Sequence, residues 1–248
     1  MDLDGKVAVV TGGNGGLGQR ICHALANAGC HIAVVYAQSR DEAEQVADDL
    51  GGDSKAAAFQ CDVTDPAQVE SLASGVVAKF GRLDILVNDA AYNKWIAFDD
   101  LDGMTDDEWS RMLAVNLTGP MMAIKAVVPE MRRNGGGRIV NISSVAGLGP
   151  QGSSIGYAVS KAGLIHLTKC MAVALEPDIL VNCVAPGFLE GTRATANLDP
   201  EFQARARTGS LLRRPVDKDD VGRQVAEFCA TDSTTGQTLV MDSGRIFH

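Results

Sequence analysis

Short apolar runs alternate with amphipathic segments along most of the chain. The apolar runs are expected strands, at 6–13, 31–37, 55–63, 83–88, 137–144, 179–187 and 238–244. The amphipathic segments are expected helices, at 17–28, 41–50, 66–80, 107–133 and 157–175. Strands that are apolar on both faces and are separated by helices indicate a parallel sheet covered on both sides. The pattern therefore predicts one α/β, doubly wound (Rossmann) domain over 1–248, with a mostly or wholly parallel seven-stranded sheet and helices on both faces.

Two stretches depart from this alternation. Gly119 and Pro120 lie inside the helical pattern of 107–133, where a proline removes a backbone donor, so we expect a break or kink there. Residues 188–212 follow no regular pattern, and long inserts in compact domains are more often lids or binding loops than defects. We expect a lid-like insert over about 188–212.

Composition excludes several classes of protein. A hydrophobic content of 46% with 21% charged residues is typical of a globular chain. The net charge of −9 argues against nucleic acid or an anionic membrane as the main partner, because both select basic surfaces. No apolar run approaches the roughly 20 residues that span a bilayer, and the acidic start does not resemble a secretory signal. The six cysteines form no metal-binding pairs, so we expect no metal site and a reducing, cytoplasmic location.

A glycine-rich loop, "TGGNGGLG" at 11–18, joins the first expected strand to the first expected helix. Glycines there let backbone amides approach a phosphate, and the helix N-terminus adds partial positive charge. The loop fits both G-x-G-x-x-G and T-G-x-x-x-G-x-G, in the strand-to-helix context that a dinucleotide site requires. A purely structural turn is the alternative, because glycines also serve tight packing.

The second expected strand ends in "YAQSR" and offers no acid for an adenosine ribose. Ser39 and Arg40 could receive a 2′-phosphate there, since a guanidinium matches phosphate geometry. We therefore favour NADP(H), with NAD(H) possible. In the alternative interpretation, Ser39 caps the following helix in a capping box with Glu42, and Arg40 is a solvated residue of its first turn.

Tyr157 and Lys161 stand one helical turn apart in "YAVSK", so their side chains should share a face. A tyrosine hydroxyl has a pKa of about 10, and a nearby ammonium or an oxidised nicotinamide would lower it by favouring the phenolate. Ser144 ends an expected strand thirteen residues earlier, where open α/β sheets bind ligands. The hypothesis is that Ser144 and Tyr157 converge on one carbonyl oxygen. A surface pair at Tyr157 and Lys161 and a simple turn at Ser144 are the alternatives.

Together these motifs resemble the short-chain dehydrogenase/reductase family over nearly the whole chain. "TGGNGGLG", "CDVTD", "VNDAA", "LAVNLTG", "NISSVAG", "YAVSK" and "APG" follow the family order and spacing. The resemblance implies that Tyr157 is the general acid/base and that Ser144 positions the substrate oxygen. It also implies that Lys161 lowers the tyrosine pKa and binds ribose, and that Asn116 holds a water in the proton relay.

The same resemblance implies a set of cofactor contacts. Besides Tyr157 and Lys161 they are Gly12, Asn14, Gly16, Leu17, Gly18, Ser39, Arg40, Asp62, Val63, Asn88, Ala90, Pro186, Gly187 and Thr192. Two departures stand out in "VNDAA", where Asp89 replaces the family's second asparagine and Ala91 replaces its glycine. Thr192 also stands one residue later after Pro186 and Gly187 than is usual. The glycine loop lacks the basic residue of many NADP-binding relatives.

The substrate is expected to be a small carbonyl compound or alcohol, contacted by residues of the loops that follow the strands. The expected contacts are Ser144, Leu148, Gln151, Phe188 and Trp95, although Trp95 could instead pack against a helix or subunit. The resemblance further implies a homo-oligomer, a tetramer or dimer, built through the long helices and the C-terminal segment. A catalytically silent NAD(P)-binding sensor or scaffold is the main alternative function. A methyltransferase would leave the Tyr157–Lys161 pair unexplained.

Overall fold

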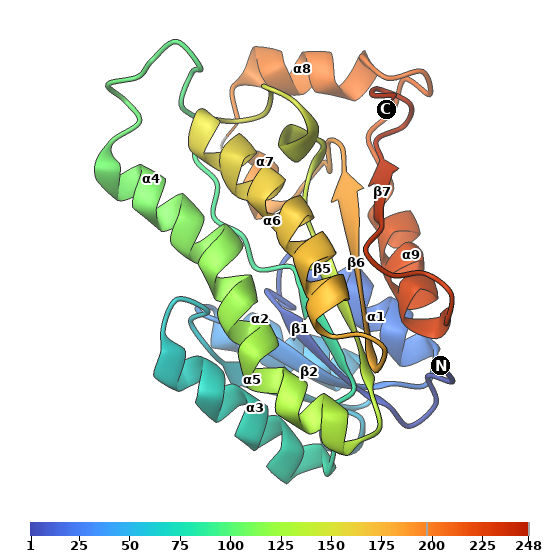
Figure 1. Ribbon diagram of the computed structural model, residues 1–248. Coiled ribbons are helices and arrows are strands. Elements are labelled where there is room, and N and C mark those ends of the chain that lie inside the picture. The colour runs from blue at the N-terminus through green and yellow to red at the C-terminus, as the bar shows by residue number, and fades with distance from the viewer. Residues whose placement is uncertain (197, 248) are drawn as a thin grey trace.

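The protein is built around one twisted parallel sheet (Figure 1). The computed structural model describes residues 1–196 and 198–247, so Asn197 of the expected insert and the last residue, His248, lie outside it. The strands lie in the order β3-β2-β1-β4-β5-β6-β7 and all pair in parallel. They are β1 (Val7–Thr11), β2 (His31–Tyr36), β3 (Ala56–Gln60), β4 (Ile85–Asn88), β5 (Gly137–Ile142), β6 (Ile179–Pro186) and β7 (Thr238–Met241). The predicted seven-stranded doubly wound fold is confirmed.

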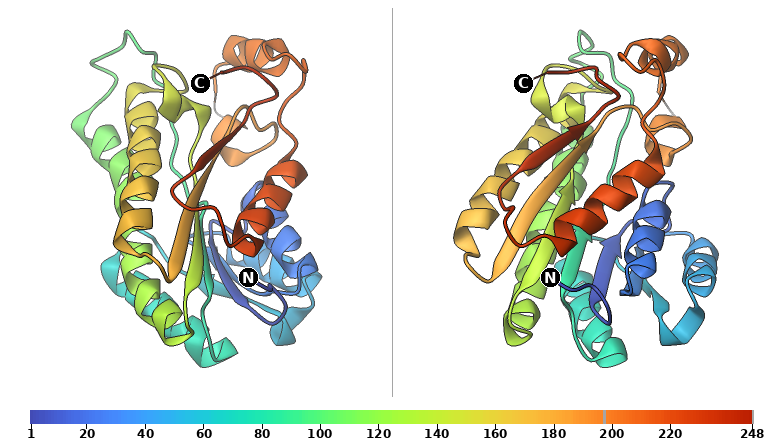
Figure 2. Two further views of the ribbon diagram at one scale, coloured as in Figure 1. Left: turned by 45° about the vertical axis from the view of Figure 1, so that its right-hand side comes forward. Right: turned by 90° about the vertical axis from the view of Figure 1, so that its right-hand side faces the viewer.

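Helices cover both faces of this sheet (Figure 2). They are α1 (Gly18–Asn27), α2 (Arg40–Asp49), α3 (Pro66–Phe80), α4 (Asp106–Leu113), α5 (Gly119–Arg133), α6 (Ile155–Ala174), α7 (Arg193–Ala196), α8 (Pro200–Thr208) and α9 (Lys218–Ala230). Apolar side chains of α1, α2 and α9 pack on one face, and those of α3, α5 and α6 on the other. The central strands are buried throughout, which explains their nearly continuous apolar sequences.

The long helical segment of 106–133 does not end at Gly119 and Pro120. A π-helical turn, Ala114–Thr118, joins α4 to α5, and Pro120 lies in the first turn of α5, where a missing backbone donor is tolerated. The expected break is therefore a local widening of one helix, and such turns recur at functional sites. By length and composition alone this helix could cross a membrane. It packs against α3, α6 and strands β4 and β5, as a helix within a globular fold does.

The expected irregular insert of 188–212 is partly helical. It contains α7 and α8, and the Asp199 carboxylate caps α8 by accepting a hydrogen bond from the Phe202 backbone N–H at 2.8 Å. Figure 1 shows both helices at the end of the molecule toward which the β6 arrow points. The insert therefore stands over the carboxyl edge of the sheet, where ligands bind in open α/β folds.

Candidate active site

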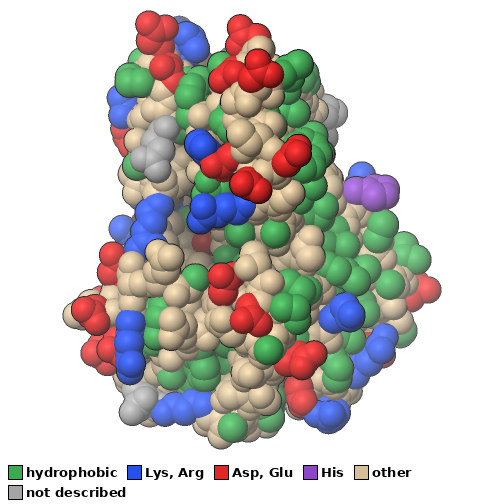
Figure 3. Space-filling view, turned by 90° about the vertical axis from the view of Figure 1, so that its left-hand side faces the viewer, with side chains coloured by type: hydrophobic (Ala, Val, Ile, Leu, Met, Phe, Trp, Pro, Cys, Tyr) green, Lys and Arg blue, Asp and Glu red, His purple; other side chains and the backbone are tan. Residues whose placement is uncertain are grey.

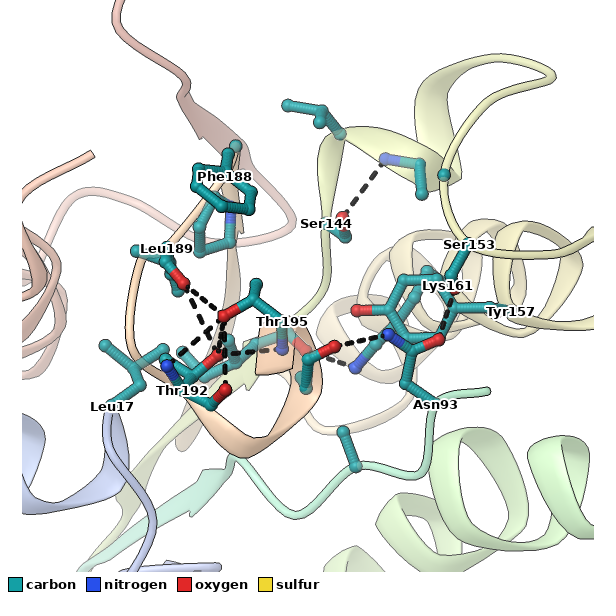
Figure 4. Close-up of a pocket in the computed structure, with 18 of the residues that line it drawn as sticks. Leu17, Asn93, Ser144, Ser153, Tyr157, Lys161, Phe188, Leu189, Thr192 and Thr195 are labelled. Carbon is teal, nitrogen blue, oxygen red and sulfur yellow. Dashed lines mark hydrogen bonds between the residues drawn. The ribbon is translucent and has the colours of Figure 1, made fainter. Parts of the chain in front are cut away.

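A cavity of about 260 Å³ opens at the carboxyl edge of the sheet. Its walls come from the loops after β1, β4, β5 and β6, from the start of α6 and from α7 and α8 (Figure 4). The strand order reverses direction between β1 and β4, and this is the switch point at which doubly wound sheets bind ligands. The cavity therefore combines the glycine loop with the Tyr157 region in one site.

The glycine loop is shaped by close backbone contacts. Gly12 has φ +67°, a left-handed conformation that favours glycine. A Cβ on Gly18 would lie 2.2 Å from the Gly12 carbonyl oxygen, so only glycine fits there. The backbone N–H groups of Gly16 and Leu17 have no acceptor among the described residues, and both residues line the cavity. These free donors at the N-terminus of α1 fit a dinucleotide phosphate.

The loop after β4 is fixed against the glycine loop by a single hydroxyl. The Thr11 Oγ1 atom accepts hydrogen bonds from the backbone N–H groups of Asp89 and Ala90, each at 3.1 Å. A Cβ on Gly12 would lie 3.0 Å from the Cα of Ala90, so the two loops are in close contact. Thr11 thus holds Asp89 and Ala90 at the wall of the cavity.

The end of β2 differs from the capping-box interpretation. Ser39 adopts a left-handed conformation, φ 62°, and its side chain caps nothing on α2. Instead the Asn14 amide donates to the backbone carbonyl oxygen of Gln38 at 3.2 Å, which ties the glycine loop to this turn. Arg40 is exposed and pairs with Glu44 at 2.6 Å. The structure thus excludes the side-chain cap at Ser39, but it places Arg40 as the alternative interpretation had it, exposed in the first turn of α2.

Ser144, Tyr157 and Lys161 line the same cavity (Figure 4). Ser144 follows β5, and its Oγ accepts a hydrogen bond from the Ala146 backbone N–H at 3.1 Å. Tyr157 lies in the first turn of α6, which Ser154 caps through the Tyr157 backbone N–H at 3.2 Å. The Lys161 Nζ lies 5.7 Å from the centroid of the Tyr157 ring. The three side chains that the motifs selected are thus brought together.

Burial dominates the electrostatics of this group. It raises the pKa of the Tyr157 hydroxyl to about 12, with the Ser144 hydroxyl lowering it and the Asp89 charge raising it. Burial also lowers the pKa of Lys161 to about 8, against the opposing effect of Asp89. The expected lowering of the tyrosine pKa by Lys161 is therefore not found: the net shift is upward, and Lys161 is not among its causes. The Lys161 ammonium instead donates to the backbone carbonyl oxygen of Ile142 at 2.8 Å.

Asn116 occupies the π-helical turn and is completely buried. Its Oδ1 accepts a hydrogen bond from the Tyr92 backbone N–H at 2.8 Å, and its Nδ2 donates to the Tyr92 carbonyl oxygen at 2.9 Å. Its Nδ2 also donates to Ser160 Oγ at 3.0 Å. Asn116 does not line the cavity, and its contacts hold the loop after β4 against α6.

The remaining predicted cofactor residues divide into two groups. Those that line the cavity are Gly12, Asn14, Gly16, Leu17, Ala90, Pro186, Gly187 and Thr192. Those outside its lining are Gly18, Ser39, Arg40, Asp62, Val63 and Asn88. Asn88 is buried and its amide donates to Asn141 Oδ1 at 2.8 Å, so it joins β4 to β5.

The predicted substrate residues also divide. Ser144, Gln151 and Phe188 line the cavity, whereas Leu148 and Trp95 lie outside its lining. The Trp95 ring packs against Phe202 of α8 with centroids 5.2 Å apart, as the alternative interpretation of Trp95 had it. This contact joins the loop after β4 to the outer helix.

Sequence reasoning missed several wall residues. Asn93 accepts a hydrogen bond from Ser153 and donates one to the Ala194 carbonyl oxygen at 2.8 Å, which connects the loop after β4 with α7 (Figure 4). Leu198, Phe202 and Ala206 complete an apolar wall from the insert. A helical spacing of apolar residues within 198–206 was the only available signal for them, and no local pattern marks Asn93.

Known proteins match this chain in both sequence and fold. The family model described as short chain dehydrogenase matches residues 6–202. The 3-oxoacyl-(acyl-carrier-protein) reductase of Escherichia coli K12 is 35% identical, covering 98% of this chain and 98% of its own. The human dehydrogenase/reductase SDR family member 4 is 33% identical, covering 98% and 88%. A solved structure of 7 alpha-hydroxysteroid dehydrogenase, complexed with NADH and 7-oxo glycochenodeoxycholic acid, matches with a TM-score of 0.89 at 33% identity, covering 98% and 94%.

Proposed function

The chain belongs to the short chain dehydrogenase family of nicotinamide-dependent oxidoreductases, and on that premise we propose that it interconverts a ketone and a secondary alcohol. The observation that carries this proposal is the shared cavity. Ser144, Tyr157 and Lys161 line it together with the free amides of the glycine loop. A proton donor, a cation and a phosphate site thus lie in one enclosure, as hydride transfer to a carbonyl requires.

Each side chain has a distinct task in this proposal. The Ser144 hydroxyl holds the substrate oxygen, and the Tyr157 hydroxyl donates a proton to that oxygen in reduction and accepts it in oxidation. Lys161 stabilises negative charge as it develops on the tyrosine oxygen. Gly16 and Leu17 would hold the cofactor phosphate through their N–H groups. The cofactor, when bound, supplies or accepts the hydride. Asn116 would hold a water of the proton relay, as the family resemblance implies, and its amide also supports the loop after β4.

The cavity wall favours a ketone with an apolar body. Phe188, Leu198, Phe202 and Ala206 supply that wall, and Gln151, from the segment between β5 and α6, adds a polar group to the lining. The name of the Escherichia coli relative includes a 3-oxoacyl group, and the related steroid dehydrogenase was solved with 7-oxo glycochenodeoxycholic acid. Both compounds are ketones with an apolar portion. We propose the same general class here.

NADP(H) is the cofactor we propose as preferred. Ser39 and Arg40 follow β2, at the place where an acidic residue would favour an unphosphorylated ribose. The Arg40 guanidinium is exposed there. To bind the cofactor, Arg40 would have to release the Glu44 carboxylate and bind the 2′-phosphate instead. The phosphate carries more negative charge than a carboxylate and matches the geometry of the guanidinium. NAD(H) remains the alternative cofactor, and the related steroid dehydrogenase structure contains NADH.

We also propose that the enzyme is a cytoplasmic homo-oligomer, a dimer or tetramer. Large apolar side chains are exposed on α6, at Val159 and Val173, and on the C-terminal segment, at Leu239 and Phe247. Figure 3 shows hydrophobic side chains among the charged ones on the side of the molecule at the left of Figure 1. Gel filtration with light scattering tests this proposal, and a monomer mass of 26.0 kDa would contradict it.

The reaction is tested by following the absorbance of NADPH and NADH with a panel of apolar ketones, and of the oxidised cofactors with secondary alcohols. We expect turnover with at least one ketone–alcohol pair and stronger use of the phosphorylated cofactor. Tight cofactor binding without turnover across the panel would favour the sensor or scaffold. Absence of cofactor binding would contradict the proposal altogether.

A further inference from the structure

Arg245 brings a cation to the cavity from the C-terminal segment after β7, and the proposed reaction assigns it no task. Its side chain has no hydrogen bond or ion pair with any described residue. The other two cations of the lining are already engaged. Lys161 donates to the Ile142 carbonyl oxygen at 2.8 Å, and Arg193 pairs with Glu42 of α2. Arg245 is therefore the one cation of the described lining that has no acceptor.

The backbone of the C-terminal segment is fixed in a turn around one carboxylate. The Oδ1 atom of the buried Asp242 accepts hydrogen bonds from the backbone N–H groups of Gly244 at 2.9 Å and Arg245 at 3.1 Å. Its Oδ2 atom accepts from the Ile246 N–H at 2.7 Å. The Leu211 N–H, in the segment after α8, donates to the Gly244 carbonyl oxygen at 3.1 Å. The position of the Arg245 backbone is thus set by the fold.

This turn lies against the loop that carries part of the apolar cavity wall. The Gly187 N–H donates to the Met241 carbonyl oxygen at 2.8 Å. A Cβ on Gly187 would lie 2.9 Å from the Cα of Asp242, so the two backbones are in close contact. Phe188, the next residue, belongs to the apolar wall. Arg245 is exposed although it lines the cavity, so its side chain lies where the cavity opens to solvent.

We propose that Arg245 binds a carboxylate that the substrate carries apart from its reacting carbonyl, so that the substrates are oxo acids with an apolar body. The guanidinium offers parallel N–H donors that match a carboxylate. A phosphate monoester carries more negative charge and calls for more than one cation, but the second arginine of the lining is paired with Glu42. The inference deepens the proposed function, on which it rests for the reaction but not for the binding of the anion.

The order of the strands indicates how far apart the two ends of such a substrate lie. Ser144 follows β5 and Arg245 follows β7, and β6 lies between these strands. Neighbouring strands are about 4.8 Å apart, so the two strand ends are about 10 Å from each other. Asp89, which would repel an anion, follows β4 on the other side of β5. The oxo group and the carboxylate are therefore expected at opposite ends of an apolar chain.

Carboxylate binding tests this site without turnover. The enzyme is saturated with NADP⁺, and straight-chain carboxylates from hexanoate to dodecanoate are compared by calorimetry with the amides of the same length. We expect the wild type to bind the best carboxylate about fivefold more tightly than its amide, the modest effect of a charge pair at a solvated position. Arg245→Gln should remove this preference. Arg214→Gln, an equal loss of exposed charge outside the cavity lining, should keep it.

Reversal of the charge provides a second variant. Arg245→Glu should bind alkylamines more tightly than carboxylates of the same length, because the charge at the cavity opening changes sign. With ketones that turn over, the ratio of kcat/KM for an oxo acid to kcat/KM for its amide should fall about fivefold in Arg245→Gln. Circular dichroism of each variant checks that the fold is retained.

The possible results separate this inference from the proposed reaction. Equal binding of carboxylates and amides by the wild type at every length would overturn the inference. A preference that survives in folded Arg245→Gln would overturn the assignment to Arg245, and tighter binding of alkyl phosphates would overturn the choice of a carboxylate. A preference that Arg245→Gln removes, in a protein that turns over no ketone, would leave the anion site standing while the proposed function fails.

Discussion

Lys161 Nζ donates a hydrogen bond to the backbone carbonyl oxygen of Ile142 at a distance of 2.8 Å, which ties α6 to the carboxyl end of β5. The lysine side chain is only 2% exposed, so its ammonium has little water to replace this partner. The contact fixes where the charge lies relative to Tyr157. It also leaves the other ammonium protons available to a ligand in the cavity.

Replacement of Lys161 by methionine removes this charge while keeping a similar length of apolar side chain. We expect NADPH affinity to fall about tenfold and the rate of ketone reduction about a hundredfold, because a cation is lost both from the ribose site and from beside the proton donor. Fluorescence titration and steady-state kinetics measure the two effects. Lys169→Met, on a part of α6 that does not line the cavity, is the matched control. Unchanged affinity and rate would exclude Lys161 from the site.

We expect Arg40 to distinguish the two cofactors. We expect Arg40→Ala to raise KM for NADPH about tenfold and to leave KM for NADH within about twofold, since only NADPH carries a 2′-phosphate for the guanidinium. Glu44→Gln, which frees Arg40 from its present partner, should keep or improve the use of NADPH. Equal effects of Arg40→Ala on both cofactors, or a wild-type preference for NADH, would contradict the assignment of NADP(H).

Asn116 is expected to matter for stability. The Asn116→Ala substitution leaves the partly buried N–H and carbonyl groups of Tyr92 without their side-chain partner. We expect the free energy of unfolding to fall by about 1–3 kcal/mol, which denaturant titration measures. Gln45→Ala, an exposed amide on α2 with one side-chain partner, serves as the control and should change it by less than about 0.5 kcal/mol. A loss in Asn116→Ala as small as the control's would show that the loop needs no such support.

The dependence on pH should differ between the two directions of the reaction. In the proposed mechanism, alcohol oxidation needs the Tyr157 oxygen deprotonated, and its pKa is raised to about 12, so kcat/KM for oxidation should rise with pH from 7 to about 8 and level off where Lys161 loses its charge. Ketone reduction needs the protonated hydroxyl, which is retained over this range. Its kcat/KM should instead fall as Lys161, with a pKa lowered to about 8, loses its charge. An oxidation rate that falls between pH 7 and 10 would contradict the role of Tyr157 as base.

The fold and the centre of the site could be predicted because their signals are local. Strands such as β1 and β4 are buried at every position, so their sequences are nearly continuous apolar runs. Tyr157 and Lys161 are one turn apart in a helix, and Ser144 follows a strand whose end faces the cavity. Helical spacing and strand polarity therefore sufficed to bring them together.

Other features depend on contacts between distant segments and could not be predicted. The π-helical turn at Ala114–Thr118 accompanies the hydrogen bonds of Asn116 with Tyr92, which lies 24 residues away. Ser39 adopts a left-handed conformation, and its carbonyl oxygen accepts a hydrogen bond from the Asn14 amide of the glycine loop. The local sequence instead favours a helix cap at Ser39. The choice between substrate contact and helix packing for Trp95 depends likewise on Phe202, which lies against it from a helix that the pattern did not predict.

Single-turnover reduction by Tyr157→Phe tests the central claim most directly. The enzyme is saturated with NADPH, mixed with a ketone found in the panel, and followed by the loss of reduced-nicotinamide absorbance. Removing one hydroxyl deletes the proton donor and leaves the ring in place, so the rate of hydride transfer should fall at least about a hundredfold while Kd for NADPH changes by less than about threefold. A transfer rate within about twofold of the wild type would contradict the account.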